Sequence, residues 1–103
     1  MEIKSATSED VLTLFLEGNL NYHEAKAAEQ FFNELIADER QVIFNLKDIH
    51  YISNTGLLLF KKISEEFGEK NQTLQIKGAS HFIRESFQLA GIDDLFVWLE
   101  GGL

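Results

Sequence analysis

The chain has 103 residues, 45% of them hydrophobic and 25% charged, which is enough for one globular domain with its own core. Its net charge of −8 argues against a nucleic-acid-binding protein, because phosphate contacts require clustered Lys and Arg, and it favours neutral or basic partners. The absence of cysteine excludes disulfides and thiolate zinc sites. We therefore expect a single domain spanning residues 1–103.

The amino-terminal segment MEIKSATSED contains no apolar core and does not form a signal peptide. No apolar run approaches the roughly 20 residues that a membrane-spanning helix needs. These two observations predict a cytoplasmic protein with no direct membrane insertion.

Two strands are predicted at the start of the chain. Residues Met1–Ala6 are expected to form an edge strand. Leucine occupies every second position of Val11–Glu17, which is typical of a strand with one buried face. Gly18 is expected to end this strand. The inward face of this second strand would consist of Leu12, Leu14 and Leu16.

The first helix is predicted over Tyr22–Ala37. Asn21 is its expected N-cap, and Glu24 completes a variant of the capping box three residues later. Apolar residues then recur at helical spacing and give the helix one core-facing side. They are Ala25, Ala28, Phe32, Leu35 and Ile36.

The apolar run Val42–Leu46 predicts a buried central strand. A polar and aromatic loop that contains His50 and Tyr51 is expected to follow it. The segment from Ser53 to Gly56 would then bring hydroxyl groups and unpaired backbone N–H groups to one exposed point.

A second helix is predicted from about Asn54 to Phe67, with Ser53 or Asn54 as its cap and Gly68 as its stop. The first turn is apolar nearly all round, which predicts burial on more than one side. The apolar positions are Leu57, Leu58, Leu59, Phe60, Ile63 and Phe67.

The last third of the chain predicts a short strand at Thr73–Lys77, a helix that Ser80 caps and Gly91 closes, and a final strand at Leu95–Leu99. Trp98 either covers the core or offers a dimer edge, and core packing is favoured. The apolar residues of the third helix are Phe82, Ile83, Phe87 and Leu89.

This order of elements predicts an α/β fold. Strands that alternate with helices require crossover connections and parallel strand pairs, whereas the opening pair is expected to be antiparallel. The expected architecture is therefore a single mixed sheet of four to five strands, with helices covering mainly one face.

Four segments in this order resemble the STAS domain family of bacterial anti-sigma-factor antagonists. The family has G-x-[LI]-[DN] before its first helix, and residues 18–21 read GNLN. Its second conserved strand resembles residues 42–46, VIFNL, and its loop I-D-S-[ST]-G-[LI] corresponds to residues 52–57, ISNTGL. Residues 82–92 resemble its closing helix. The resemblance implies the STAS fold over nearly the whole chain.

The resemblance also implies partner switching. Such a domain binds an anti-sigma factor that is also a serine kinase, the kinase phosphorylates a serine at the start of the second helix, and a phosphatase reverses the modification. In this chain the family's aspartate is Ser53 and its phosphorylated serine is Asn54, whereas Thr55 keeps the next hydroxyl. An asparagine cannot be phosphorylated, so the switch does not carry over directly.

Three hypotheses follow from this departure. The phosphorylation site has moved to Thr55 or Ser53, with Thr55 favoured; or the domain is a permanently unphosphorylated binder; or it serves as a non-switching STAS subunit of a transporter or a signalling scaffold. The expected partner-binding residues are those of a module that contacts its partner as an anti-sigma-factor antagonist would. They are Asn19, Asn21, Tyr22, His23, Ser53, Asn54, Thr55, Gly56 and Leu57.

Other chemistry has weaker support. The three histidines, His23, His50 and His81, lack the helical i, i+4 spacing of a ligand pair. Acidic residues scatter over predicted surface faces, and no Gly-rich phosphate loop is present. We therefore expect a protein that is not an enzyme, that binds neither metal nor cofactor, and that is a monomer or weak dimer.

Overall fold

A computed structural model describes residues 1–36 and 41–99 of the chain. Five strands form one sheet in the order β1-β2-β3-β4-β5, so neighbours in sequence are also neighbours in the sheet. Only β1 and β2 pair in antiparallel fashion, and the remaining neighbouring pairs are parallel. The elements follow the order β1 (Glu2–Ser8), β2 (Val11–Leu20), α1 (Tyr22–Ile36), β3 (Gln41–Ile52), α2 (Asn54–Glu69), β4 (Gln75–Lys77), α3 (His81–Leu89), a 3₁₀ turn (Asp93–Leu95) and β5 (Val97–Leu99).

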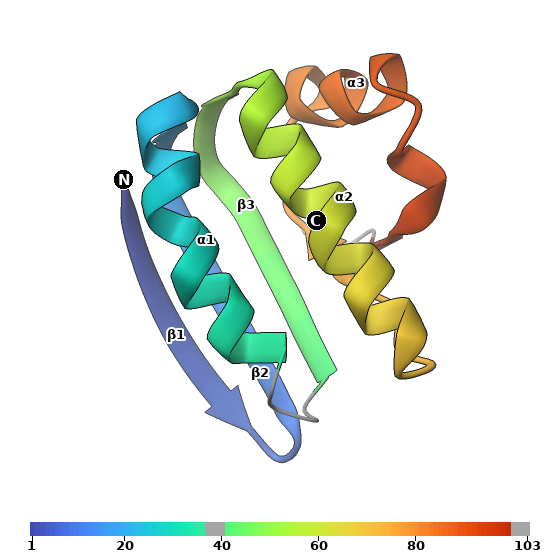
Figure 1. Ribbon diagram of the computed structural model, residues 1–103. Coiled ribbons are helices and arrows are strands. Elements are labelled where there is room, and N and C mark those ends of the chain that lie inside the picture. The colour runs from blue at the N-terminus through green and yellow to red at the C-terminus, as the bar shows by residue number, and fades with distance from the viewer. Residues whose placement is uncertain (37–40, 100–103) are drawn as a thin grey trace.

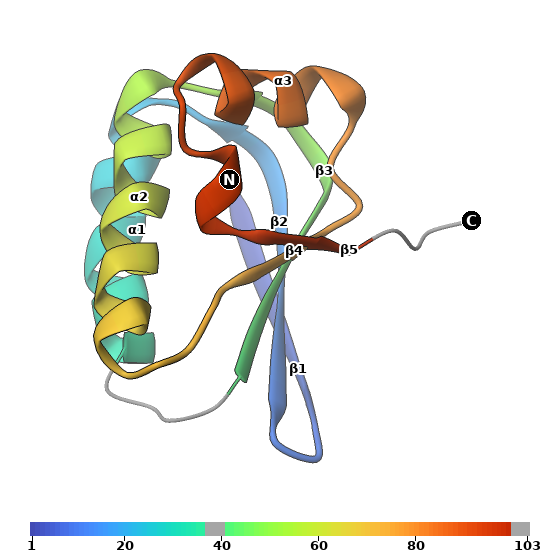
Figure 2. The same ribbon diagram turned by 90° about the vertical axis from the view of Figure 1, so that its right-hand side faces the viewer.

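The predicted α/β order and the mixed sheet are confirmed. Helices α1 and α2 lie side by side on one face of the sheet, and α3 lies across one end (Figures 1 and 2). The opposite face carries no described helix. No helix in the described part of the chain is long and apolar enough to cross a membrane. The predicted end of α1 at Ala37 lies outside the described residues, as do the side chains of Leu35 and Ile36.

The predicted strand bounds need correction. Strand β1 runs two residues past its predicted end at Ala6, and β4 and β5 are shorter than the predicted Thr73–Lys77 and Leu95–Leu99, because Leu95 belongs to the 3₁₀ turn. Strands β2 and β3 continue well beyond their predicted ends. The predicted end of β2 at Gly18 was wrong: the strand continues to Leu20, and Gly18 within it has a φ of 118°. Strand β3 continues through Ile52, so the expected loop around His50 and Tyr51 is strand instead. The two extensions pair with each other across register shifts at Phe15/Glu17 and Gly18/Asn19. Such irregularities bend a strand and redirect its end.

The core is a chain of aromatic rings between the sheet and the helices. Phe44 of β3 meets Phe32 of α1 at 5.3 Å and Phe60 of α2 at 5.1 Å, measured between ring centroids. Phe87 of α3 lies 5.4 Å from Phe60 and 5.1 Å from Trp98. These rings meet edge to face, the favourable arrangement for aromatic pairs. They tie all three helices to the sheet, and Trp98 packs on the core as expected.

The helix ends follow local hydrogen bonding. Asn21 caps α1 by accepting the Glu24 N–H at 3.0 Å, and Ser80 caps α3 by accepting the Ile83 N–H at 3.2 Å, both as predicted. Gly91 follows α3 with a φ of 73°, the left-handed conformation that closes a helix. The prediction for Gly68 was wrong, because α2 continues to Glu69 and Asn71 takes the left-handed conformation.

Candidate functional site

Two junctions, between β2 and α1 and between β3 and α2, lie next to each other at one end of the sheet. Leu20 and Ile52 are paired in the strand register, and the Ser53 N–H donates a 2.9 Å hydrogen bond to the Leu20 carbonyl. Both helices therefore begin at the same end of the molecule, at the top of Figure 1. The structure thus brings together the two segments that the sequence selected, residues 19–23 and 53–57.

The start of α2 is closely packed against the ends of both strands. Ser53 is its N-cap and accepts the Gly56 N–H at 3.1 Å. A Cβ on Gly56 would lie 2.9 Å from Cγ1 of Ile52 and 3.1 Å from the Leu20 side chain. Gly56 is buried and faces inward, so it shapes the site by letting the helix approach rather than by offering a surface of its own.

The exposed residue at this junction is Asn54. Its side chain is in solvent at the first position of α2, while Ser53 and Thr55 on either side of it are half-buried. Thr55 lines a groove between α1 and α2, and Leu57 is buried at the floor of a groove toward α3. A helix start carries unpaired backbone N–H groups and a partial positive charge.

The other junction supplies a polar and aromatic border. Asn19, Asn21, Tyr22 and His23 are all exposed there. The rings of Tyr22 and His23 meet edge to face at 5.5 Å. Only one half of the predicted capping box is seen. Asn21 accepts the Glu24 N–H, whereas the Glu24 carboxylate forms an ion pair with the Met1 amino group at 3.4 Å.

Three apolar residues near this end are exposed to solvent. Leu58, Phe82 and Leu89 are 64%, 62% and 82% exposed. The expected burial of the first turn of α2 on more than one side was wrong for Leu58, because each helix has one buried face, which on α3 is formed by Ile83 and Phe87. Phe82 and Leu89 are seven residues apart and lie on another stripe of α3, a spacing that was visible in the sequence.

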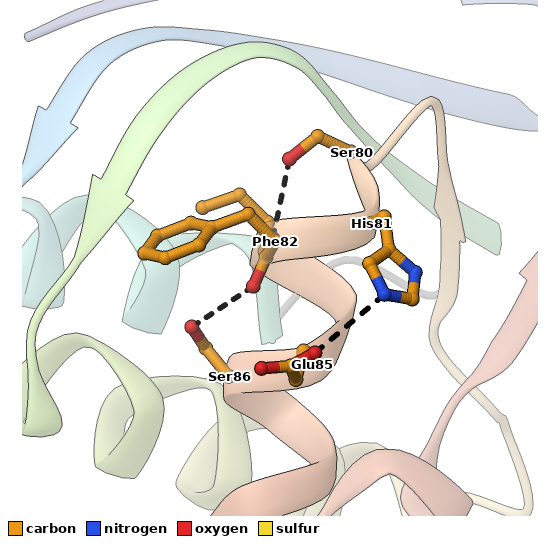
Figure 3. A network of polar contacts seen from close by, with 6 residues as sticks. Ser80, His81, Phe82, Glu85 and Ser86 are labelled. Carbon is orange, nitrogen blue, oxygen red and sulfur yellow. Dashed lines mark hydrogen bonds and ion pairs between the residues drawn. The ribbon is translucent and has the colours of Figure 1, made fainter.

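The polar contacts of α3 lie on two sides. Ser86 donates from its hydroxyl to the Phe82 carbonyl at 3.2 Å, and His81 lies 3.5 Å from Glu85. In Figure 3 the Phe82 ring and the Ser86 hydroxyl point to the same side, away from the His81–Glu85 pair. Within the described residues, no group of three or more His, Cys, Asp or Glu is placed to hold a metal ion.

The chain is similar to known proteins over almost its whole length. The STAS domain family matches residues 2–101. An anti-sigma-B factor antagonist of Staphylococcus aureus is 26% identical over 102 residues, which cover 98% of this chain and 94% of that protein. The anti-sigma factor antagonist SpoIIAA in its unphosphorylated form superposes with a TM-score of 0.77 at 13% identity, covering 98% and 90% of the two chains. A sulfate transporter family protein from Wolinella succinogenes superposes with a TM-score of 0.75 at 14% identity, covering 90% and 80%.

Proposed function

We propose that this chain, which belongs to the STAS domain family, is an anti-sigma-factor antagonist that acts by binding an anti-sigma factor with serine kinase activity. The proposal rests on its similarity over nearly full length to an anti-sigma-B factor antagonist. On this proposal the domain is a cytoplasmic protein-interaction module rather than an enzyme. A phosphatase would be its second partner if a phosphorylated form arises.

The position of Asn54 supports a binding surface at this end of the domain. It is exposed at the start of α2, on a surface to which both strand–helix junctions contribute. A partner that docks there meets two helix starts, the polar border of α1 and the side chain of Asn54. The binding residues are therefore Asn19, Asn21, Tyr22, His23, Ser53, Asn54, Thr55 and Leu57, with Gly56 beneath them.

Asn54 makes the domain a permanently binding form. An amide is compact and neutral, whereas a phosphate adds a charge of about −1.5 to −2 that would drive a closely docked partner away. The hydroxyl groups of Ser53 and Thr55 are poorer targets for a kinase, because both residues are half-buried and Ser53 is engaged as the helix cap. Thr55 is the better of the two candidates, since its hydroxyl has no capping role.

A binding experiment tests the proposal. The purified domain is used to recover partners from lysate of its own organism, alongside an Asn54→Asp variant that carries a carboxylate at the same position. We expect an anti-sigma-type kinase with the wild-type chain and a loss of at least about tenfold in affinity with the variant, because a charge is placed in the contact. Asn33→Asp is the matched control, since Asn33 is exposed along α1. Recovery of no kinase, phosphatase or sigma-pathway protein would contradict the proposal.

A second candidate function is a STAS subunit that regulates a transporter without switching. The observation that favours it is the shared fold with a sulfate transporter family protein. An ABC-type transport operon around the gene would support this alternative, and a neighbouring anti-sigma kinase gene would support the first. In the same recovery experiment, a membrane transport protein bound equally by wild type and Asn54→Asp would favour the subunit.

A further inference from the structure

Leu58 forms an apolar ridge between two grooves on the helical side of the proposed binding surface. One groove, of about 300 Å³, lies between α2 and the segment after α3, and is lined by Asn54, Leu57, Leu58, Lys61, Ala90 and Ile92. The other, of about 200 Å³, lies between α1 and α2 and includes Thr55. Small-molecule pockets usually have volumes of about 300–1,000 Å³, and these grooves are at or below the lower end of that range. They are therefore better suited to single side chains of a protein partner than to a small molecule.

The stripe on α3 continues this apolar surface. Leu89 lines a further groove of about 230 Å³ together with Asn54, Leu57 and Ser86. Leu89 and Leu58 are among the most exposed large apolar residues of the described chain. A contiguous exposed apolar patch with a polar border is typical of a protein-binding site rather than of ordinary surface.

The charge around the ridge is opposite to that of the chain. Lys61 lines the groove toward α3, and Lys26 and Lys62 line the groove toward α1. The carboxylate in these linings is Glu29, which is bound to Lys62 at 3.0 Å. The start of α2 adds a partial positive charge. A chain of net charge −8 thus carries a locally positive, apolar surface beside Asn54.

We infer that these grooves bind an acidic, amphipathic segment of the partner, whose large apolar side chain enters beside Leu58 and whose carboxylates meet Lys61 and Lys26. The inference rests on the proposed function, since it specifies the partner's chemistry at the same surface. It differs from the neutral or basic partner that net charge alone predicts. Lys26, Lys61 and Lys62 line the grooves themselves, whereas Glu66, which acts on Lys62, belongs to neither lining. Salt screens the carboxylates that lie more than about 8 Å away under physiological conditions.

A second copy of this chain does not fit the surface equally well. Two copies each carry a charge of −8 and repel one another over the contact as a whole. Exposed apolar side chains such as Phe15 and Val97 also lie on the uncovered face of the sheet. Acidic and basic residues both surround them, so the charge of that face does not indicate the chemistry of a partner.

Peptide probes of defined sequence test the inference without knowledge of the natural partner. The isotope-labelled domain is titrated with a leucine–glutamate peptide of helical period, with its leucine–lysine counterpart, and with a scrambled leucine–glutamate peptide that lacks an apolar stripe. We expect the amide NMR signals of Leu58, Lys61 and Leu89 to shift with the first peptide, which should bind at least about tenfold more tightly than the other two and more weakly as salt rises.

Paired variants identify the contact. Lys61→Glu should abolish binding of the leucine–glutamate peptide, whereas Lys77→Glu, the same charge change on exposed Lys77 of β4, should leave it intact. Leu58→Ser should weaken binding and Val97→Ser should not. Equal or tighter binding of the leucine–lysine peptide, signal shifts confined to the sheet face, or no binding of any peptide would overturn the inference. None of these results bears on recovery of the kinase, which tests the proposed function separately.

Discussion

The Ser53 backbone N–H and the Leu20 carbonyl form a 2.9 Å hydrogen bond between the two strand–helix junctions. This bond continues the ladder of β2 and β3 by one step beyond their last register pair, Leu20 and Ile52. It sets the position of α2 relative to the start of α1. The surface around Asn54 is consequently a composite of two segments, residues 19–23 and 53–57, and its shape depends on how closely α2 approaches the sheet.

The substitution Gly56→Ala is expected to destabilise the domain by roughly 1–3 kcal/mol, as overpacking does. The new methyl group would lie 2.9 Å from Cγ1 of Ile52, and α2 would have to move outward. Urea unfolding followed by circular dichroism measures the change. The control is Gly68→Ala, where a Cβ meets nothing within 4 Å and the higher helix propensity of alanine should stabilise by about 0.5–1 kcal/mol. Equal stability of Gly56→Ala and the wild type would show that α2 is not closely packed against Ile52 and Leu20 at this position.

Incubation of the domain with the anti-sigma-type kinase proposed as its partner should label an Asn54→Ser variant and not the wild type. The introduced hydroxyl would be exposed where the hydroxyls of Ser53 and Thr55 are half-buried. Mass spectrometry maps the modification, and the labelled variant should lose binding to the kinase because of the added charge. Thr55→Val in the Asn54→Ser background controls for labelling at the neighbouring residue. Stoichiometric label on wild-type Thr55 or Ser53, with loss of binding, would contradict a permanently binding form.

Phe60→Ala is expected to cost about 3–5 kcal/mol, a large part of the roughly 5–15 kcal/mol stability of a typical domain. Phe60 is fully buried and contacts the rings of Phe32, Phe44, Phe87 and Phe96. Its removal should lower the urea midpoint strongly. Phe15→Ala, at a ring that is 41% exposed on the uncovered sheet face, should have a much smaller effect. Similar losses for both variants would refute the central place of Phe60 in the core.

The Glu29–Lys62 pair should give a pH-dependent contribution to stability. Its hydrogen bond and ion pair hold the pKa of Glu29 below its ordinary 4.5 and raise the pKa of Lys62 above its ordinary 10.5. The Glu29 contribution is therefore present above pH 4.5 and lost as pH falls through the lowered pKa. The Lys62 contribution is present below pH 10.5 and lost as pH rises through the raised one.

The difference in urea midpoint between wild type and Glu29→Gln should accordingly be present at neutral pH, shrink on acidification below pH 4.5, and shrink with added salt, since both side chains are at the surface. Glu34→Gln on the exposed side of α1 serves as the control. A difference that is constant over this pH range would indicate a loss of packing rather than of charge.

The local features of the chain could be predicted from sequence because each depends on neighbours along the backbone. Asn21 and Ser80 cap their helices through residues three positions ahead, and Gly91 closes α3 by its own backbone freedom. The alternating leucines of β2 likewise indicated one buried face, since successive side chains point to opposite sides of a strand. Order, fold class and the two site segments followed from these signals.

The remaining features depend on contacts between distant residues. Strands β2 and β3 extend to Leu20 and Ile52 because each supplies the hydrogen-bonding partner of the other, which no local pattern records. Whether an apolar helix residue is buried depends on which face meets the sheet, so Leu58 and Leu89 remain exposed although Leu57 and Phe87 are buried. Lys26 and Lys62 line one groove beside Thr55 because α1 and α2 pack side by side, and Lys61 lines the adjoining groove that includes Asn54. The sequence by itself therefore determined the elements and their order, and the tertiary structure decided which side chains are exposed and which charges lie together, because burial and local charge are properties of packed surfaces rather than of segments.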